Sequence, residues 1–242
     1  MADSIRDQVV VVVGASSGIG KSTVKMAAQR GARVVAVARR EDRLRLTQTE
    51  LENSGIESWF RVADVTDAGA VEAAIQSIMT EFGRIDIAVY AAGTNAPDRA
   101  MTVLGKATWH SILDTNLNGA FYFAHAVLPP MREARTGHII FVSSTAGVIA
   151  DLSGAAYQAS KRGVLGLSHA IRLEEKNNGI RTCCIMPGLT NTELVEKRPE
   201  KLPEETLRKA LQAEDVAETI VHVMGLPPRA SIPEVLMVPT LA

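Results

Sequence analysis

The chain has 242 residues, of which 46% are hydrophobic and 22% are charged, a balance typical of a globular protein with a sizeable core. Its formal net charge is −1 and it has no long run of Lys and Arg, which argues against binding to nucleic acid. The apolar run at residues 9–13 is too short to span a bilayer, and the polar N-terminus lacks the apolar core of a signal peptide. We therefore expect a cytoplasmic protein that does not enter a membrane.

Cysteine and histidine give no sign of a disulfide framework or a metal site. Cys183 and Cys184 are the only cysteines, and neighbours in an extended strand point to opposite faces and do not easily form a disulfide. The five histidines have no ligand spacing with each other or with the cysteines. We therefore expect no metal.

Short apolar runs alternate with longer amphipathic stretches along the chain. The pattern predicts strands at residues 9–13, 33–38, 57–62, 85–90, 138–142, 181–186 and 234–238. It predicts helices at residues 17–30, 41–54, 68–82, 107–131, 155–177, 204–212 and 217–224, the fourth of them broken near Pro129 and Pro130. This alternation predicts an α/β fold with a parallel sheet covered on both faces. No shift in composition marks a second domain, so we predict a single domain over residues 1–242.

The first predicted strand runs directly into the sequence GASSGIG, from Gly14 to Gly20, where a helix begins. Glycine permits positive φ and the close approach of another backbone. The helix N-terminus offers free N–H groups and the positive end of its dipole to a pyrophosphate. The spacing differs from the general G-x-G-x-x-G fingerprint, and no Walker spacing is present. The place of the loop in the chain predicts a dinucleotide site; a tight turn without a ligand is the alternative.

The residues after the second and third predicted strands bear on which nucleotide binds. An acidic residue after the second strand would bind the ribose 2′-hydroxyl of NAD, but Arg39 and Arg40 stand there. Guanidinium groups suit a 2′-phosphate through paired charge-assisted hydrogen bonds, so we expect NADP, with NAD less favoured. Asp64 is placed either to reach an adenine amino group or to cap a turn.

Tyr157 and Lys161 lie four residues apart in the sequence YQASK, within a predicted helix rich in small residues. Residues i and i+4 share a helix face, so the phenol and the ammonium point the same way. One interpretation is a half-buried tyrosine beside a solvated lysine. The other is an acid–base pair in which the ammonium lowers the pKa of the phenol.

Six stretches along the chain resemble, in order and spacing, those of the short-chain dehydrogenases/reductases. They are GASSGIG at 14–20, ADV at 63–65, TNLNG at 115–119, FVSSTAG at 141–147, YQASK at 157–161 and PGLTNT at 187–192. The resemblance covers essentially the whole chain. It implies a doubly wound, mainly parallel, seven-stranded Rossmann sheet with helices on both faces. It also implies hydride transfer between NADP(H) and a carbonyl or alcohol, and a homotetramer or homodimer.

The resemblance assigns roles residue by residue. Tyr157 matches the general acid or base, Lys161 its partner, and Ser144 the residue that holds the substrate oxygen, with Ser143 a weaker candidate. Asn116 matches a residue that kinks its helix and holds a water in a proton relay. A turn cap for Ser144 and a plain polar helix residue for Asn116 are the alternatives. The residues expected to bind the cofactor are Gly14, Ser16, Ser17, Gly18, Ile19, Gly20, Arg39, Arg40, Asp64, Val65, Ala92, Gly93, Tyr157, Lys161, Pro187, Gly188 and Thr192.

Two positions depart from the family pattern. Val13 stands where the family usually has a threonine before the glycine loop, and YAAG at residues 90–93 replaces NNAG. Because those asparagines stabilise the central strand and adjoin the cofactor, we expect the departures to affect the loop and coenzyme affinity more than the chemistry.

The sequence favours an NADP-dependent oxidoreductase that acts on a small polar carbonyl or hydroxy compound. A 3-oxoacyl thioester is the alternative substrate, although the glycine-rich C-terminal sequence common in acyl-carrier-protein reductases is absent. A non-catalytic nucleotide-sensing protein and a lyase or epimerase with bound NAD are the other classes; the Tyr–Lys pair argues against the first and Arg39 against the second. The expected substrate wall comprises Thr94, Asn95, Thr145, Gly147, Ile149, Asp151, Leu189 and Leu194.

Overall fold

The computed structural model describes residues 5–241, so residues 1–4 and 242 at the ends of the predicted domain lie outside the described residues. Its centre is a seven-stranded sheet in the order β3-β2-β1-β4-β5-β6-β9, and every neighbouring pair is parallel. The strands are β1 (Val9–Val13), β2 (Arg33–Ala38), β3 (Trp59–Val62), β4 (Ile87–Tyr90), β5 (Gly137–Val142), β6 (Ile180–Pro187) and β9 (Glu234–Met237). The predicted doubly wound α/β Rossmann sheet is confirmed.

Two hydrophobic cores lie on opposite faces of this sheet. Side chains alternate between the faces of a strand, so Val9, Val11 and Val13 enter one core while Val10 and Val12 enter the other. The adjacent cysteines divide in the same way and are free thiols, as their spacing predicts. A strand buried on both faces explains why the β1 sequence is an unbroken run of valine.

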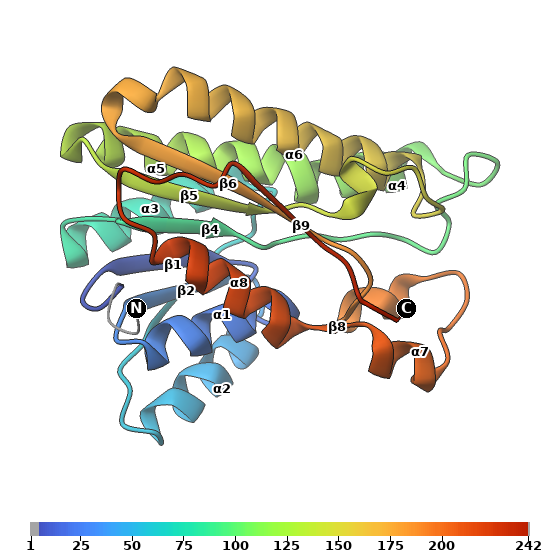
Figure 1. Ribbon diagram of the computed structural model, residues 1–242, viewed down its shortest axis with the longest axis horizontal. Helices are drawn as coiled ribbons and strands as arrows, with labels where there is room; N and C mark the ends of the chain where they lie inside the picture. Colours follow the sequence, from blue (N-terminus) through green and yellow to red (C-terminus); the bar gives the residue numbers. More distant parts are fainter. Residues whose placement is uncertain (1–4, 242) are drawn as a thin grey trace.

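Helices cover both faces of the sheet (Figure 1). One face carries α1 (Gly18–Gln29), α2 (Glu41–Glu52) and α8 (Ala213–Met224). The other carries α3 (Ala68–Phe82), α5 (Gly119–Ala134) and α6 (Ala155–Glu174), with α4 (Lys106–Leu113) beside α6. No helix of residues 5–241 is both long and apolar enough to cross a membrane.

The predicted helix at residues 107–131 is not broken where the sequence indicated. Pro129 and Pro130 lie inside α5, which continues to Ala134. The neighbouring Val127, Leu128 and Met131 are buried, so packing against the sheet holds the helix despite two missing N–H donors. The irregularity lies earlier, at a π-helical turn over Asp114–Asn118 that separates α4 from α5. This turn contains Asn116, for which a helix kink was expected.

The segment after β6 folds differently from its sequence pattern. It forms β7 (Thr190–Asn191), a 3₁₀ helix over Glu193–Lys197 and α7 (Glu204–Lys209). The predicted helix at 204–212 ends early because Leu211–Gln212 pair with β7 as strand β8. Gln212 then caps α8 in a reciprocal capping box with Asp215, so α8 begins four residues before the predicted start at 217.

Candidate active site

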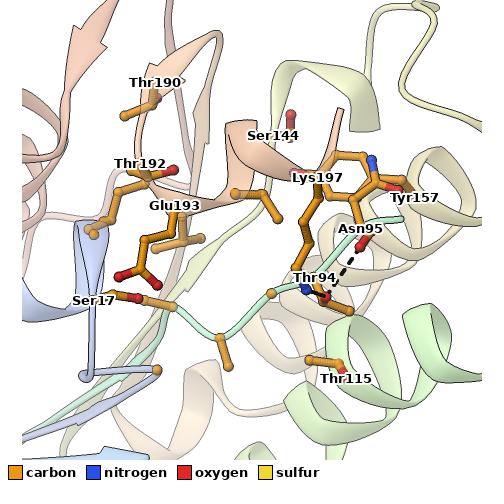
Figure 2. A pocket seen from close by; sticks show the side chains of 18 of the residues that line it. Ser17, Thr94, Asn95, Thr115, Ser144, Tyr157, Thr190, Thr192, Glu193 and Lys197 are labelled. Atoms are coloured by element: carbon orange, nitrogen blue, oxygen red, sulfur yellow. Dashed lines mark hydrogen bonds between the residues drawn. The ribbon is translucent and has the colours of Figure 1, made fainter. Parts of the chain in front are cut away.

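A cavity of about 400 Å³ opens at the carboxyl ends of the parallel strands (Figure 2). In a doubly wound sheet this edge is where ligands bind. Its walls contain most of the residues that the sequence singled out: Gly14, Ser16, Ser17, Gly18, Ile19, Arg39, Arg40, Val65, Ala92, Gly93, Ser144, Tyr157, Lys161, Pro187, Gly188 and Thr192. Gly20, Asp64 and Asn116 do not line the cavity and lie behind its walls.

The glycine loop is shaped by close backbone contacts. Gly14 has φ +83°, and a Cβ there would collide with the backbone of Ala92. A Cβ on Gly20 would collide with the carbonyl of Gly14. Gly20 therefore lets α1 approach the end of β1. The resulting concave loop leads into the N-terminus of α1, where free N–H groups suit a pyrophosphate.

Arg40 organises the end of the cavity where a 2′-phosphate would bind. Its Nε and Nη2 atoms donate to Ser16 Oγ at 3.1 and 2.9 Å, and Nη2 also donates to Ser17 Oγ at 2.8 Å. Arg39 is less engaged: its side chain is 67% exposed and pairs with Asp64 at 3.2 Å. A guanidinium and two hydroxyl groups in one cluster form a donor set suited to a phosphate monoester.

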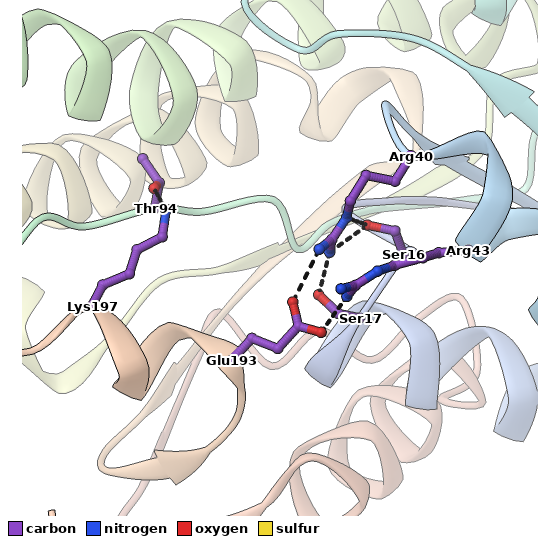
Figure 3. A network of polar contacts seen from close by, with 7 residues as sticks. All are labelled: Ser16, Ser17, Arg40, Arg43, Thr94, Glu193 and Lys197. Atoms are coloured by element: carbon purple, nitrogen blue, oxygen red, sulfur yellow. Dashed lines mark hydrogen bonds and ion pairs between the residues drawn. The ribbon is translucent and has the colours of Figure 1, made fainter. Parts of the chain in front are cut away.

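The side-chain carboxylate of Glu193 contacts this cluster (Figure 3). Arg40 Nη1 donates to Glu193 Oε2 at 3.0 Å, and Arg43 pairs with the other carboxylate oxygen. These two hydrogen-bonded arginines hold the pKa of Glu193 below its usual value, against the opposing effect of burial. The sequence analysis missed Arg43 and Glu193. Arg43 lies one helical turn beyond the recognised arginines, and Glu193 is 150 residues away from it.

Asp64 acts as a turn cap. Its Oδ1 accepts hydrogen bonds of 2.9 Å from the backbone N–H and the hydroxyl of Thr66, while Oδ2 pairs with Arg39. Burial raises the pKa of Asp64, but these hydrogen bonds and Arg39 together leave it lowered. Of the two roles considered for Asp64, the structure favours the cap, and the neighbouring Val65 lines the cavity instead.

Tyr157 and Lys161 share a face of α6 at the other end of the cavity. Lys161 is 4% exposed, donates to the carbonyl of Val142 at 2.9 Å, and lies 5.7 Å from the centroid of the Tyr157 ring. The interpretation of Lys161 as a solvated lysine is therefore wrong. Gly93 faces the ammonium, since a Cβ there would lie 3.2 Å from Lys161 Nζ.

Two neighbouring serines at the end of β5 have different partners. Ser144 Oγ lines the cavity and accepts from Ala146 N at 3.2 Å, so it is both a turn cap and an accessible hydroxyl. Ser143 Oγ donates to the carbonyl of Lys161 at 2.7 Å, which ties α6 to β5. Ser143 is thereby occupied, and Ser144 is the hydroxyl available to a ligand.

Burial dominates the protonation of the tyrosine and the lysine. It raises the pKa of Tyr157 to about 12, although the Ser144 hydroxyl and the charges of Arg198 and Arg99 act in the opposite direction. Burial also lowers the pKa of Lys161 to about 8. Desolvation outweighs the charges around the ring, and the lowering of the phenol pKa by Lys161 stays a prediction.

Asn116 supports the cavity wall from behind. Its side chain accepts from Thr94 N at 2.7 Å and donates to Thr94 O and Ser160 Oγ at 3.0 Å. Asn116 is fully buried, so it fixes the loop after β4 against α6. A water relay through Asn116 remains a prediction.

Comparison with known proteins agrees with this geometry. The family model described as short chain dehydrogenase matches residues 8–203, which is most of the chain. The protein is a member of the short-chain dehydrogenase family. An uncharacterized oxidoreductase of Staphylococcus saprophyticus is 32% identical over 244 residues, covering 98% of each chain.

Solved structures of short-chain dehydrogenases share the fold closely. A metagenomic short-chain oxidoreductase in complex with NADP has a TM-score of 0.85 at 30% identity, covering 99% of this chain and 100% of that one. The closed form of a serine dehydrogenase with NADP+ has a TM-score of 0.88 at 32% identity, covering 97% of this chain and 96% of that one.

One departure from the short-chain dehydrogenase pattern has a structural explanation. The Tyr90 hydroxyl, in the position of the family's first asparagine, donates to the carbonyl of Thr115 at 2.5 Å. A Cβ on Gly119 would collide with this hydroxyl. The phenol therefore occupies space that a glycine leaves free and binds the π-helical turn to the central strand. Burial raises the pKa of Tyr90 well above its usual value, so it remains a donor.

The cavity wall beyond the tyrosine is more basic than the sequence indicated. Of the expected substrate wall, Thr94, Asn95, Thr145, Asp151, Leu189 and Leu194 line the cavity, whereas Gly147 and Ile149 do not. Arg99, Lys197 and Arg198 line it as well and were missed. No local sequence pattern marks them, because they come from the loop after β4 and the 3₁₀ segment, which meet only in the folded chain.

Proposed function

We propose that this protein is an NADP-dependent oxidoreductase that interconverts a small secondary alcohol and the corresponding carbonyl compound. One cavity joins the Arg40 cluster at one end to Ser144, Tyr157 and Lys161 at the other, and this observation carries the proposal. On this proposal residues 1–242 form one domain that both binds the cofactor and performs the reaction.

The described residues fit a nicotinamide dinucleotide. The concave glycine loop suits the pyrophosphate, Ser16, Ser17 and Arg40 suit a 2′-phosphate, and Lys161 stands ready for the nicotinamide ribose. The preference for NADP over NAD rests on the Arg40 cluster and is supported by the NADP-bound relatives. When bound, the nucleotide supplies or accepts the hydride.

The chain's own residues would position the substrate and move the proton. Ser144 would donate a hydrogen bond to the substrate oxygen and so orient the carbonyl. Tyr157 would donate its phenolic proton to that oxygen in reduction and accept it in oxidation. Lys161, fixed by Val142, would stabilise the phenolate that remains. A phenol with a pKa of about 12 is protonated at neutral pH, which is the form that donates a proton in reduction.

The polar lining of the cavity favours a small polar substrate. Thr94, Asn95, Asp151 and Ser153 contribute polar groups around the tyrosine, and the 3₁₀ segment above them is charged. The serine dehydrogenase among the structural neighbours acts on a small hydroxy compound of this kind.

We also propose that the protein forms a homodimer or homotetramer. Phe121 on α5 and Leu173 on α6 are 49% and 57% exposed, so each offers apolar surface to a second copy. Sedimentation equilibrium would test this, and a monomer at micromolar concentration would overturn it.

The oxidoreductase proposal is tested by NADPH oxidation with a panel of small ketones, for the wild type and Tyr157→Phe. We expect the wild type to turn over at least one of them. Tyr157→Phe should lose turnover and keep NADPH affinity within about tenfold, because the ring still packs but cannot donate a proton. A variant with near-normal rate would overturn the role of Tyr157.

A further inference from the structure

Two arginines beside Tyr157 form no ion pair with a carboxylate among residues 5–241. Four arginines line the cavity: Arg39, Arg40, Arg99 and Arg198. Arg39 and Arg40 are paired with carboxylates. Within residues 5–241, neither Arg99 nor Arg198 makes a side-chain hydrogen bond or ion pair, although both are half-buried. A half-buried guanidinium without a partner has given up hydration without compensation.

The two guanidinium groups also lie close enough to repel each other. Burial and the charge of Arg198 lower the pKa of Arg99, and Asp151 offsets them only in part. The same two arginines act on the pKa of Tyr157. Their positive charges are therefore felt at the phenol that would hold the substrate oxygen.

Close contacts fix the backbone of the loop that carries Arg99. Asn95, which is buried, donates to Ser153 O at 3.0 Å and joins the loop of Arg99 to the loop before α6. Gly154, with φ +95°, packs so tightly on Arg99 that a Cβ there would lie 2.7 Å from the Arg99 carbonyl oxygen.

Arg198 follows the 3₁₀ helix Glu193–Lys197 and is placed by it. The backbone N–H of Arg198 donates to Val195 O at 3.1 Å. Lys197 Nζ donates to Thr94 Oγ1 at 2.6 Å and anchors the segment across the cavity (Figure 2). The backbone segments that carry the two arginines are thus fixed before any ligand binds.

We propose that Arg99 and Arg198 bind a carboxylate of the substrate, so that the substrate is a short hydroxy acid or oxo acid. This inference rests on the proposed oxidoreductase function and names its substrate class. Arg99, Arg198 and Lys197 bring three positive charges to this wall against the one carboxylate of Asp151, so the wall attracts an anion. Guanidinium groups bind carboxylates through paired, charge-assisted hydrogen bonds.

The test is calorimetric titration of the full-length protein, with and without saturating NADP+. The ligands are 3-hydroxybutanoate, its methyl ester, and glycerol 3-phosphate. We expect the acid to bind at least about tenfold more tightly than the ester. The ester has no negative charge, so it cannot form the charge-assisted hydrogen bond to a desolvated guanidinium. Equal affinity for acid and ester, no measurable binding of the acid, or tighter binding of the phosphate would each overturn the carboxylate assignment.

Substitution of the two arginines tests whether they bind the acid. Arg99→Ala and Arg198→Ala should each weaken binding of the acid by about tenfold or more and leave binding of the ester within about twofold. Arg99→Lys should recover part of the loss, since it keeps the charge but not the paired donors. Arg229→Ala, an exposed arginine outside the cavity, is the matched control. Unchanged binding of the acid in both cavity variants would contradict the assignment.

The same samples separate this inference from the proposed function. If the protein oxidises NADPH with neutral ketones but does not prefer acids, only the carboxylate inference fails. If it binds no nicotinamide nucleotide, the proposed function fails, and the titration without NADP+ still reports whether Arg99 and Arg198 bind the acid.

Discussion

Glu193 accepts a hydrogen bond of 3.0 Å from Arg40, the residue that we propose binds the 2′-phosphate of NADP. Its other carboxylate oxygen pairs with Arg43, so Glu193 stands where a phosphate would compete for the same donors. The 3₁₀ helix that carries Glu193 is also tied to Thr94 through Lys197 (Figure 3). Binding of NADP(H) would therefore replace one anion with another at Arg40.

Glu193→Gln should bind NADPH more tightly than the wild type. The variant keeps an acceptor but removes the competing charge. Because the ion pair is partly exposed, we expect a gain of about two- to fivefold. Fluorescence titration with NADPH and NADH checks this, and NADH affinity should not change. Glu196→Gln, on the same 3₁₀ helix, is the control. Weaker NADPH binding in Glu193→Gln would show that the carboxylate supports the site.

Arg40 should decide the choice of nucleotide, with Arg39 contributing little. Arg40 holds Ser16 and Ser17, whereas Arg39 is exposed and paired with Asp64. Arg40→Ala should weaken NADPH binding by about ten- to a hundredfold and change NADH binding less than about threefold. Arg39→Ala should change NADPH binding by less than about threefold. The ratio of the two dissociation constants measures both effects; a larger loss in Arg39→Ala would reverse the assignment.

The rate of carbonyl reduction should fall as the solution becomes alkaline. Burial lowers the pKa of Lys161 to about 8, so its ammonium is present below this pH and is lost above it. Tyr157, with a pKa of about 12, stays protonated over the same range. We expect kcat/KM for reduction to be level at about pH 6 to 7 and to fall towards tenfold per unit above about pH 8. A level profile to about pH 10 would show that the charge of Lys161 is not needed.

Tyr90→Phe should destabilise the protein. The variant loses the hydrogen bond to the part-buried carbonyl of Thr115, at a cost of about 0.5 to 1.5 kcal/mol in the free energy of unfolding. Urea denaturation measures this cost. Tyr122→Phe is the control, since the described residues include no hydrogen-bond partner of the Tyr122 hydroxyl. An equal effect of the two substitutions would argue against a special role for the contact between Tyr90 and Thr115.

His138 should make the protein less stable at mildly acid pH. It is buried in β5, neither ring nitrogen has a partner among residues 5–241, and burial lowers its pKa to about 3. In the unfolded chain the pKa of His138 is about 6.5. Below that pH the unfolded chain binds a proton that the folded chain does not, so the free energy of unfolding decreases as the pH decreases.

Replacement of His138 by leucine removes that proton uptake. Between about pH 7.5 and 5.5 the wild type should lose about 1.4 kcal/mol more stability than His138→Leu, measured by urea unfolding at both pH values. His110→Gln, at an exposed position, should behave as the wild type does. Parallel losses in the wild type and His138→Leu would mean that His138 does not titrate on unfolding.

The sequence was most informative where the residue pattern reports burial directly. The valine run of β1 and the glycine loop after it predicted both the sheet and the cofactor end of the cavity. The pattern failed at Pro129 and Pro130, where packing against the sheet outweighs a local helix-breaking tendency. The effect of burial on the pKa of Tyr157 depends on the whole fold, so no local pattern reports it.

The residues that the sequence missed come from segments far apart in the chain. Arg99 and Arg198 meet at the cavity wall because the 3₁₀ segment folds back over the loop after β4. Glu193 reaches Arg40 for the same reason. Charged residues in irregular segments have no periodicity to reveal which face they present, so only the folded chain brings them together.

The most direct test of the account is titration of the purified wild-type protein with NADPH and with NADH. The fluorescence of the bound nucleotide reports binding. We expect NADPH to bind at least about tenfold more tightly than NADH, because only NADPH carries the 2′-phosphate that Arg40 would bind. Equal affinity would contradict the proposed NADP specificity, and no binding of either nucleotide would contradict the proposed function.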